Sequence, residues 1–198
     1  MLLVIMVKVQ KDCRDYFDGY DDDSRIRSYE NQICEVSNLG CQSILEIGIG
    51  NGYVSGKMKG KGFDVVSFDF DFSLGPSVVG DMRFLPFKDS SFDVVLCAEV
   101  LEHVRFCDSV AALREIYRVS GKSVVVTLPQ SWYPYWYKLL FLRKTLFEKP
   151  IAEHYWEIGW VGFSLRKVVL AFEDVGFRVL KNYVFSGNKG HRFFVLEK

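Results

Sequence analysis

Short apolar segments alternate with amphipathic segments along most of the chain. The apolar segments are "SILEIG" (43–48), "FDVVSFDF" (63–70), "SVVGDM" (77–82), "SFDVVLCAEV" (91–100) and "KSVVVTLP" (122–129). Runs of this length predict β-strands, and residues 91–100 are apolar enough to be buried on both faces of a sheet.

Between these strands the apolar residues recur at helical spacing. This spacing predicts helices at 25–40, 109–120 and 164–176, and a weaker helix at 53–62, where Gly56 and Gly60 lower the helix propensity. Two closing strands, 177–187 and 191–198, are joined by "SGNKG", which is typical of a hairpin.

Strands that alternate with helices predict an α/β fold. We expect a doubly wound, mostly parallel sheet with helices on both faces. The 198 residues suit a single domain, with an N-terminal arm and helix over 1–40. Ligands of such sheets bind at the carboxyl ends of the strands, so candidate site residues are those that follow each predicted strand.

Composition and charge narrow the functional classes. Hydrophobic residues make up 49% of the chain, and the formal net charge is zero. A neutral chain gives no support for nucleic-acid binding, so we expect none. Five cysteines without a C-x-x-C pair favour reduced thiols and a cytoplasmic location. The apolar start lacks the features of a signal peptide, and we find no run long enough to span a bilayer.

The turn after the first predicted strand, "EIGIGNG", is rich in glycine. A dinucleotide fingerprint would place its third glycine at position 53, where this chain has Tyr53. No Gly-Lys-Ser/Thr follows, which excludes a Walker loop. Glu46 at the strand end would repel phosphates and attract a cation. Asp69, at the end of the second strand, is placed to bind both hydroxyls of a ribose. A ligand with a ribose and a positive group, such as S-adenosylmethionine, fits this pattern.

Taken in order, "ILEIGIGNG", "SFDFD", "GDMRFLPFKDSSFDVVLCAEVLEHV" and "LREIYRVSGKSVVVTLP" resemble the class I S-adenosylmethionine-dependent methyltransferases, in particular the type 11 group. The resemblance implies a seven-stranded sheet whose last strand is antiparallel. It also implies an enzyme that uses S-adenosylmethionine and releases S-adenosylhomocysteine. The methyl group would go to an oxygen or nitrogen, less readily a carbon, of a small molecule. A catalytically silent cofactor-binding module is the alternative.

The resemblance assigns roles to residues on the first two strands. Glu46 and the backbone of Gly48, Gly50 and Gly52 would surround the methionine moiety of the cofactor, and Asp69 would bind its ribose.

Further along, Phe70 would lie against the adenine. Asp81, with Met82 beside it, would accept the adenine amino group, and Glu99 would face the reactive methyl. The chain departs from the family between Asp71 and Val78, where only "FSLGPS" connects two strands. A parallel crossover is usually longer, so we expect a trimmed loop there, without a helix.

The segment "AEVLEHV" has two interpretations. If a helix begins near Glu99, then Glu99, Glu102 and His103 share one face. In the first interpretation Glu102 and His103 cap and pack the helix start, and His103 contacts the acceptor. In the second, these three residues bind a divalent metal, with His154 as a fourth ligand. That pattern is similar to metal-dependent O-methyltransferases of small-RNA ends and of quinones, which form a distant alternative.

Residues 130–160 contain all the tryptophans of the chain. In the family, elements that bind the substrate are inserted at this place, so we expect a lid. The residues expected to line an acceptor pocket are Trp132, Tyr133, His154, Tyr155 and Trp156. The acceptor would be an apolar or aromatic small molecule, a glycan or a lipid-linked sugar, and peripheral contact with a membrane is an open alternative. The other alternative is that these aromatic side chains only cover the end of the sheet.

Overall fold

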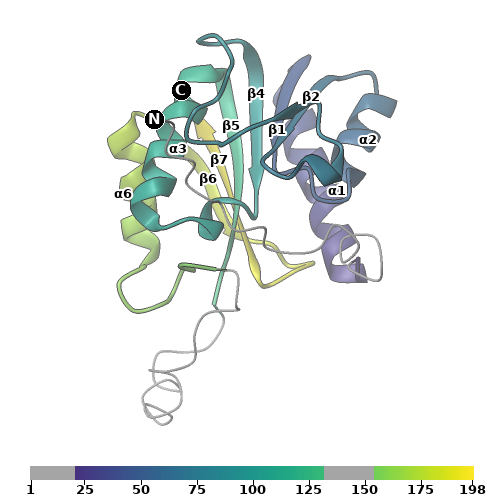
Figure 1. Cartoon of the computed structure of the whole chain (residues 1–198). Helices are drawn as coiled ribbons and strands as arrows, with labels where there is room; N and C mark the ends of the chain where they lie inside the picture. The colour runs from purple at the N-terminus through teal and green to yellow at the C-terminus, as the bar shows by residue number, and fades with distance from the viewer. Residues whose placement is uncertain (1–20, 132–153) are drawn as a thin grey trace.

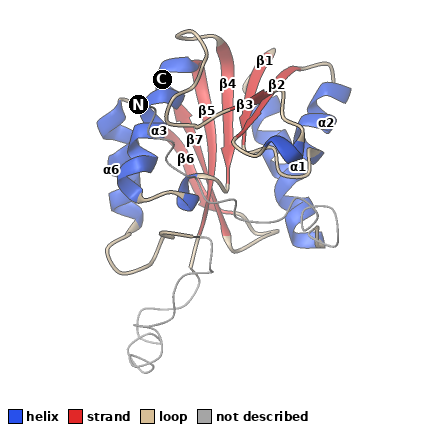
Figure 2. Cartoon of the chain, viewed as in Figure 1, coloured by secondary structure: helices blue, strands red, loops and turns tan. Residues whose placement is uncertain are grey.

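The computed structural model describes residues 21–131 and 154–198, in which seven strands form one sheet (Figures 1 and 2). The strands are β1 (Ser43–Ile47), β2 (Asp64–Asp69), β3 (Val78–Val79), β4 (Phe92–Ala98), β5 (Ser120–Pro129), β6 (Arg178–Val184) and β7 (His191–Glu197). Their spatial order is β3-β2-β1-β4-β5-β7-β6, and β7 runs antiparallel to both of its neighbours. The predicted fold class, including the antiparallel last strand, is confirmed.

Helices cover both faces of the sheet. Among the described residues they are α1 (Asp23–Ser37), α2 (Tyr53–Gly60), α3 (Phe106–Val119) and α6 (Leu165–Val175), with 3-10 turns η2 (Phe72–Leu74) and η3 (Leu101–His103). Figure 1 shows α1 and α2 on one side of the sheet and α3 and α6 on the other. Within the described part of the chain, no helix is both long and apolar enough to cross a membrane.

The central strand β4 is buried from both sides, as its composition predicted. Val94 and Leu96 pack into the core beneath α1 and α2, whereas Val95 and Cys97 pack into the core beneath α3 and α6. All four side chains have no exposed surface. This alternation follows from the two-residue period of a strand, and it anchors the middle of the sheet.

Local chemistry sets the helix boundaries. Asp22 caps α1 because its carboxylate accepts a hydrogen bond from the Arg25 backbone N–H at 2.8 Å. Ser164 caps α6 in the same way, accepting from the Lys167 N–H at 3.2 Å. At its other end α6 stops at Gly176, whose φ of +116° favours glycine.

The trimmed crossover between β2 and β3 differs slightly from the expected loop. Residues 72–74 form the one-turn 3-10 helix η2, and Gly75 ends it with a φ of +68°. The α-helix is excluded here, as predicted, but a single tight turn is compatible with Gly75 and the following Pro76. The strand it leads to, β3, is only two residues long.

Candidate functional site

A cavity of about 540 Å³ lies at the carboxyl ends of the parallel strands. We call its two parts the β1–β3 half and the β4–β7 half. The β1–β3 half is lined by Glu46, Gly48, Gly50, Asp69, Phe70, Asp81 and Met82. The β4–β7 half is lined by Glu99, Glu102, His103, His154, Glu157 and His191. The cavity therefore brings together all the predicted cofactor-binding, catalytic and metal-ligand residues except Gly52.

The glycine turn requires glycine at each position. Gly48, Gly50 and Gly52 have φ values of +83°, +53° and +76°, in the left-handed region that other residues rarely adopt. Gly48 donates its N–H to the Phe68 carbonyl at 2.9 Å, and a Cβ added to it would overlap a methyl group of Val100. Gly52 lies away from the cavity and instead precedes the first residue of α2.

Glu46 is buried within β1, with only 4% of its surface exposed. The Ser55 hydroxyl donates a hydrogen bond to its carboxyl group. Burial raises the pKa of Glu46 to about 8. In the ligand-free protein this carboxyl therefore carries a proton at neutral pH, and a cationic ligand group would favour its release.

Asp69 joins the end of β2 to the glycine turn. One carboxylate oxygen accepts from the Ile49 N–H at 3.0 Å, and the other accepts from the Asp71 N–H at 3.0 Å. Burial raises the pKa of Asp69, although these two hydrogen bonds oppose the effect. Because each carboxylate oxygen has a second lone pair, the group can still accept hydrogen bonds from a ligand.

Asp81 has a partner that the sequence did not indicate. The Arg83 side chain donates to both of its carboxylate oxygens, with Nε at 2.9 and 3.0 Å. This hydrogen-bonded pair lowers the pKa of Asp81. Asp81 is therefore charged at neutral pH, and its contact with an adenine amino group stays a prediction.

The three histidines of the chain all lie in the β4–β7 half. His103 and His154 pack edge to face, with ring centroids 4.9 Å apart. Glu102 lies beside them and is fully buried, and burial, with the nearby charge of Glu99, raises its pKa. His191 was missed in the sequence because nothing local marks it. It begins β7, where the antiparallel direction pairs it with Pro129 at the end of β5.

No α-helix begins at Glu99, which was the condition for Glu99, Glu102 and His103 to share one face. Glu99 has a φ of +54°, which no α-helix contains, and only the 3-10 turn η3 separates it from α3. Glu99 is outside the group that Glu102 and His103 form with His154, and its Oε2 lies 3.7 Å from Nε2 of His191. His191 in turn forms a 2.8 Å hydrogen bond with the buried Ser28 hydroxyl through Nδ1.

The described aromatic residues after position 130 differ in burial and in whether they line the cavity. Trp156 is a core residue with 1% of its surface exposed, and its indole N–H donates to the Val104 carbonyl at 3.1 Å. Tyr155 is more than half exposed and lies outside the cavity lining. Neither lines the pocket as expected, whereas His154 does. Trp132, Tyr133 and the rest of the expected lid up to residue 153 lie outside the described residues.

Solved structures share this fold over nearly the whole chain. Magnesium protoporphyrin IX methyltransferase from Synechocystis, solved with bound S-adenosylhomocysteine, superposes with a TM-score of 0.69 at 16% identity, covering 93% of this chain and 91% of that one. The 1,6-didemethyltoxoflavin-N1-methyltransferase of Burkholderia thailandensis gives 0.66 at 14% identity, covering 93% and 84%. At these identities the likeness defines the class of fold: a Rossmann-like, class I methyltransferase fold.

Residues 45–125 match the family described as "Methyltransferase domain". This match and the shared fold confirm the resemblance to the class I methyltransferases of the type 11 group, whose cofactor is S-adenosylmethionine. Among curated proteins, it is 33% identical over 88 residues to an uncharacterized protein of Methanocaldococcus jannaschii, over 44% of this chain and 37% of that protein. It is 34% identical over 110 residues to the demethylmenaquinone methyltransferase of Streptomyces griseus, over 48% of this chain and 46% of that enzyme. These matches thus span less than half the length of either relative.

Proposed function

We propose that this protein transfers a methyl group from S-adenosylmethionine to an oxygen or nitrogen atom of a small molecule. The observation that carries the proposal is the single cavity with two chemically different halves. Acids and bare glycine backbone line the β1–β3 half, and imidazoles with carboxyl groups line the β4–β7 half. A donor and an acceptor bound in adjacent halves of one cavity can be held in line for displacement, which is the main task of such an enzyme.

The β1–β3 half fits the methyl donor. The buried Glu46 offers a counter-charge for its ammonium group, and Asp69 has lone pairs left for ribose hydroxyls. Gly48 lacks a Cβ, and Val100 fills the space that a Cβ would take, so the turn packs tightly beside the cavity. Phe70 adds an aromatic side chain beside Asp69 in the cavity wall, where an adenine ring would find apolar contact.

The β4–β7 half supplies the groups that an acceptor needs. The sulfonium of the donor activates the methyl group, so the chain has to align the acceptor and exclude water. An oxygen or nitrogen acceptor also loses a proton, and imidazoles accept protons near neutral pH. We assign this side of the reaction to Glu99, His103 and His154, and we add His191.

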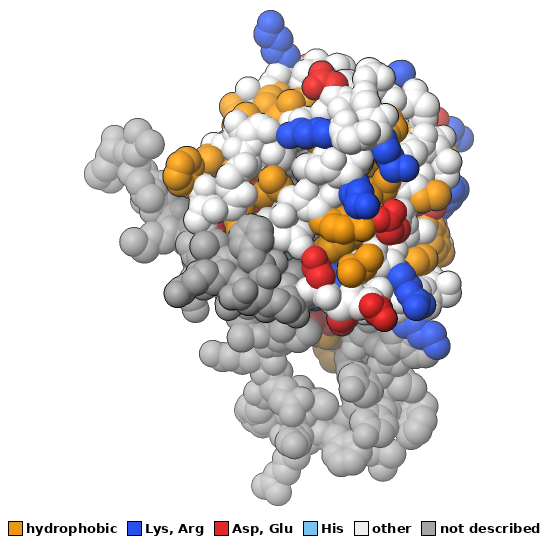
Figure 3. Space-filling view, turned by 90° about the vertical axis from the view of Figure 1, so that its right-hand side faces the viewer, with side chains coloured by type: hydrophobic (Ala, Val, Ile, Leu, Met, Phe, Trp, Pro, Cys, Tyr) orange, Lys and Arg blue, Asp and Glu red, His pale blue; other side chains and the backbone are white. Residues whose placement is uncertain are grey.

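A small-molecule acceptor fits the surface over α1 and α2 better than a folded nucleic acid does. Figure 3 shows the side of the molecule that carries α1 and α2, where basic and acidic side chains are interspersed rather than gathered in a basic stripe. Nucleic acids bind through such stripes. A glycan or a lipid-linked sugar would be a particular case of such an acceptor, because it would bring hydroxyl groups to the β4–β7 half of the cavity.

Two measurements test the proposal. Titration calorimetry with S-adenosylhomocysteine, NAD and ATP should give micromolar or tighter binding for the first and none for the others. A panel of phenols, quinols, amines and sugar derivatives is then screened with methyl-labelled donor, with the Asp69→Asn variant as the control for specific transfer. Binding of NAD in place of S-adenosylhomocysteine would refute the proposal. Cofactor binding without transfer to any acceptor would instead support the silent binding module.

A further inference from the structure

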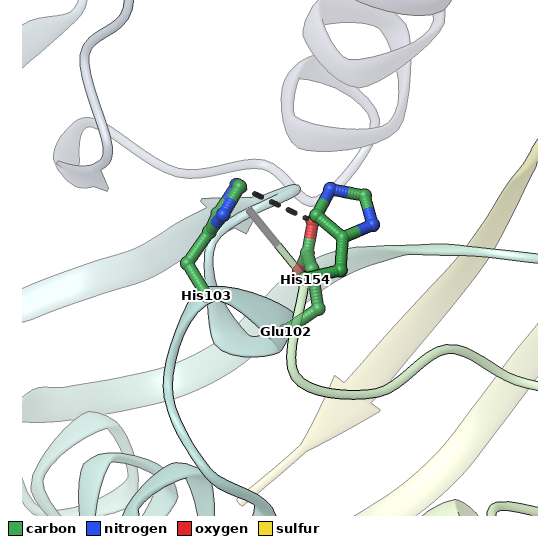
Figure 4. Close-up of side chains that lie close together, drawn as sticks. All are labelled: Glu102, His103 and His154. Carbon is green, nitrogen blue, oxygen red and sulfur yellow. Dashed lines mark ion pairs between the residues drawn. The ribbon is translucent and has the colours of Figure 1, made fainter. Parts of the chain in front are cut away.

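Three side chains in the β4–β7 half converge on one point (Figure 4). Glu102 and His103 come from η3, and His154 comes from a segment distant in sequence. Oε1 of Glu102 lies 3.8 Å from Nε2 of His103 and 4.0 Å from Nε2 of His154. One donor atom from each residue falls within 4.8 Å of the other two, which is the arrangement that a shared cation needs.

Glu102 is the residue that most needs a partner. It has no exposed surface, and neither of its carboxyl oxygens has a hydrogen-bond partner among the described residues. A buried carboxyl group without partners is costly, and natural structures retain one only where something compensates. Its Oε1 lies near both imidazoles, so a cation at that point would give this oxygen a partner (Figure 4).

His154 is already oriented to donate a lone pair to such a cation. Its Nδ1 lies 2.9 Å from Oε1 of Glu157, and a carboxylate at this distance accepts the Nδ1–H. The proton is therefore held on Nδ1, which leaves a lone pair on Nε2, 4.0 Å from Oε1 of Glu102. A carboxylate that fixes the far nitrogen of a histidine in this way is a recurrent feature around bound metal ions.

The donor set distinguishes between metals. Magnesium and calcium prefer oxygen ligands, whereas two imidazoles and one carboxylate suit zinc, manganese, iron or cobalt. Donors on one such ion lie roughly 3.0–3.4 Å apart, so this group would contract slightly on binding. Glu99, which the sequence hypothesis included, faces His191 and is outside the group.

We propose that Glu102, His103 and His154 bind a divalent transition-metal ion, and that its open side faces the cavity to bind a hydroxyl oxygen of the acceptor. The metal site does not depend on the proposed function, but its role in catalysis rests on that function. A metal ion lowers the pKa of a bound hydroxyl, so the proton leaves to water before transfer. The resulting oxygen anion attacks the methyl carbon, a C–O bond forms, and the C–S bond breaks with its electron pair going to sulfur. The products are a methyl ether and a neutral thioether, and the acceptor class is a phenol, enol or other hydroxyl compound.

The test uses the full chain without an affinity tag, stripped of metal by a chelator, and titrated with ZnCl₂, MnCl₂ and MgCl₂ by calorimetry. Zinc and manganese should bind with one ion per chain, and magnesium at least tenfold more weakly. The variants Glu102→Gln and His154→Ala should each lose at least a hundredfold in affinity, and Glu157→Gln about tenfold. The matched control is His191→Asn, a histidine of the same half outside the group, which should bind zinc like the parent.

Binding of S-adenosylhomocysteine and thermal unfolding show whether each variant is folded. Equal zinc affinity in the parent and in folded Glu102→Gln would overturn the metal site, as would the absence of zinc and manganese binding in the parent. The metal titration needs neither acceptor nor methyl transfer. A protein that binds zinc but not S-adenosylhomocysteine would keep the site and remove the proposed function. A protein that binds S-adenosylhomocysteine but not zinc would keep the proposed function and remove the metal site.

Discussion

Alanine at Gly48 should distort the turn after β1, and a second substitution should partly repair it. The added Cβ would overlap one methyl group of Val100, and that side chain cannot yield easily because it is branched at Cβ. The overlap should cost about 1–3 kcal/mol of stability, as overpacking does elsewhere. The positive φ adds roughly 1–2 kcal/mol for a residue that is not glycine.

Val100→Ala removes only the first of these two costs. The Cβ of Val100 would lie 3.6 Å from the new Cβ, an ordinary contact distance, once the methyl groups are gone. The single Val100→Ala variant should lose about 1–2 kcal/mol of burial. The double variant should therefore be more stable than the sum of the single effects by about 1–3 kcal/mol, while the strain of the positive φ remains.

Urea unfolding measures this coupling when it is applied to the parent, both single variants and the double variant. Calorimetry then measures how tightly each of them binds S-adenosylhomocysteine, which reports on the shape of the turn. We expect Gly48→Ala to weaken binding at least tenfold and the double variant to recover part of that loss. Gly56→Ala is the matched control: this glycine lies inside α2 with open space around it, so alanine should stabilise the protein by about 0.5–1 kcal/mol. Strict additivity of the Gly48 and Val100 effects would refute the packing argument.

Three further predictions concern charged residues. The pKa of Glu46 is about 8 in the folded chain, above the ordinary value of 4.5, so its contribution to stability is complete at low pH and is lost as pH rises toward 8. The advantage of Glu46→Gln over the parent in urea unfolding should therefore grow by a few kcal/mol between pH 5 and 8, and a constant difference would contradict the burial argument. Arg118 donates to the Leu85 and Phe87 carbonyls at 2.9 and 2.7 Å, so Arg118→Ala should cost about 1–3 kcal/mol, with only partial recovery in Arg118→Lys because an ammonium lacks the planar fork. Asp69→Asn should weaken S-adenosylhomocysteine binding at least tenfold while melting near the parent, and unchanged affinity would remove the ribose assignment.

The strands and helices could be predicted from the sequence because each follows from a local pattern. Residues 94–98 are apolar without interruption, and β4, which contains them, is buried on both faces. The cavity's β1–β3 half could be predicted for a related reason. Glu46, the glycine turn and Asp69 stand at the ends of adjacent parallel strands, so the rule that places ligands at those ends brings them together.

The β4–β7 half could be predicted only in part. His191 joins it through an antiparallel pairing with β5, and no sequence spacing indicates that pairing. Glu99 leaves the expected group because its backbone is left-handed, which its sequence neighbours do not require. Trp156 was expected in the pocket, yet aromatic side chains suit a core and a binding surface equally well. Only the packing of η3 and α3 around it decides between them.

Each half of the proposed site contains a buried acid. Glu46 lies within β1, and Glu102 follows β4; both are almost or fully buried. Apolar side chains of similar volume would be more stabilising in such places, so burying carboxyl groups there makes sense where a bound cation offsets the cost. In one half that cation is the ammonium of the proposed donor, and in the other it is the proposed metal ion. Because β1 and β4 are paired directly, with Glu46 opposite Leu96, the sheet places Glu46 beside the strand that leads to Glu102. In-line transfer requires the methyl carbon of the donor and the attacking atom of the acceptor to be held in line, and two ligands anchored in adjacent halves of one cavity would meet that requirement.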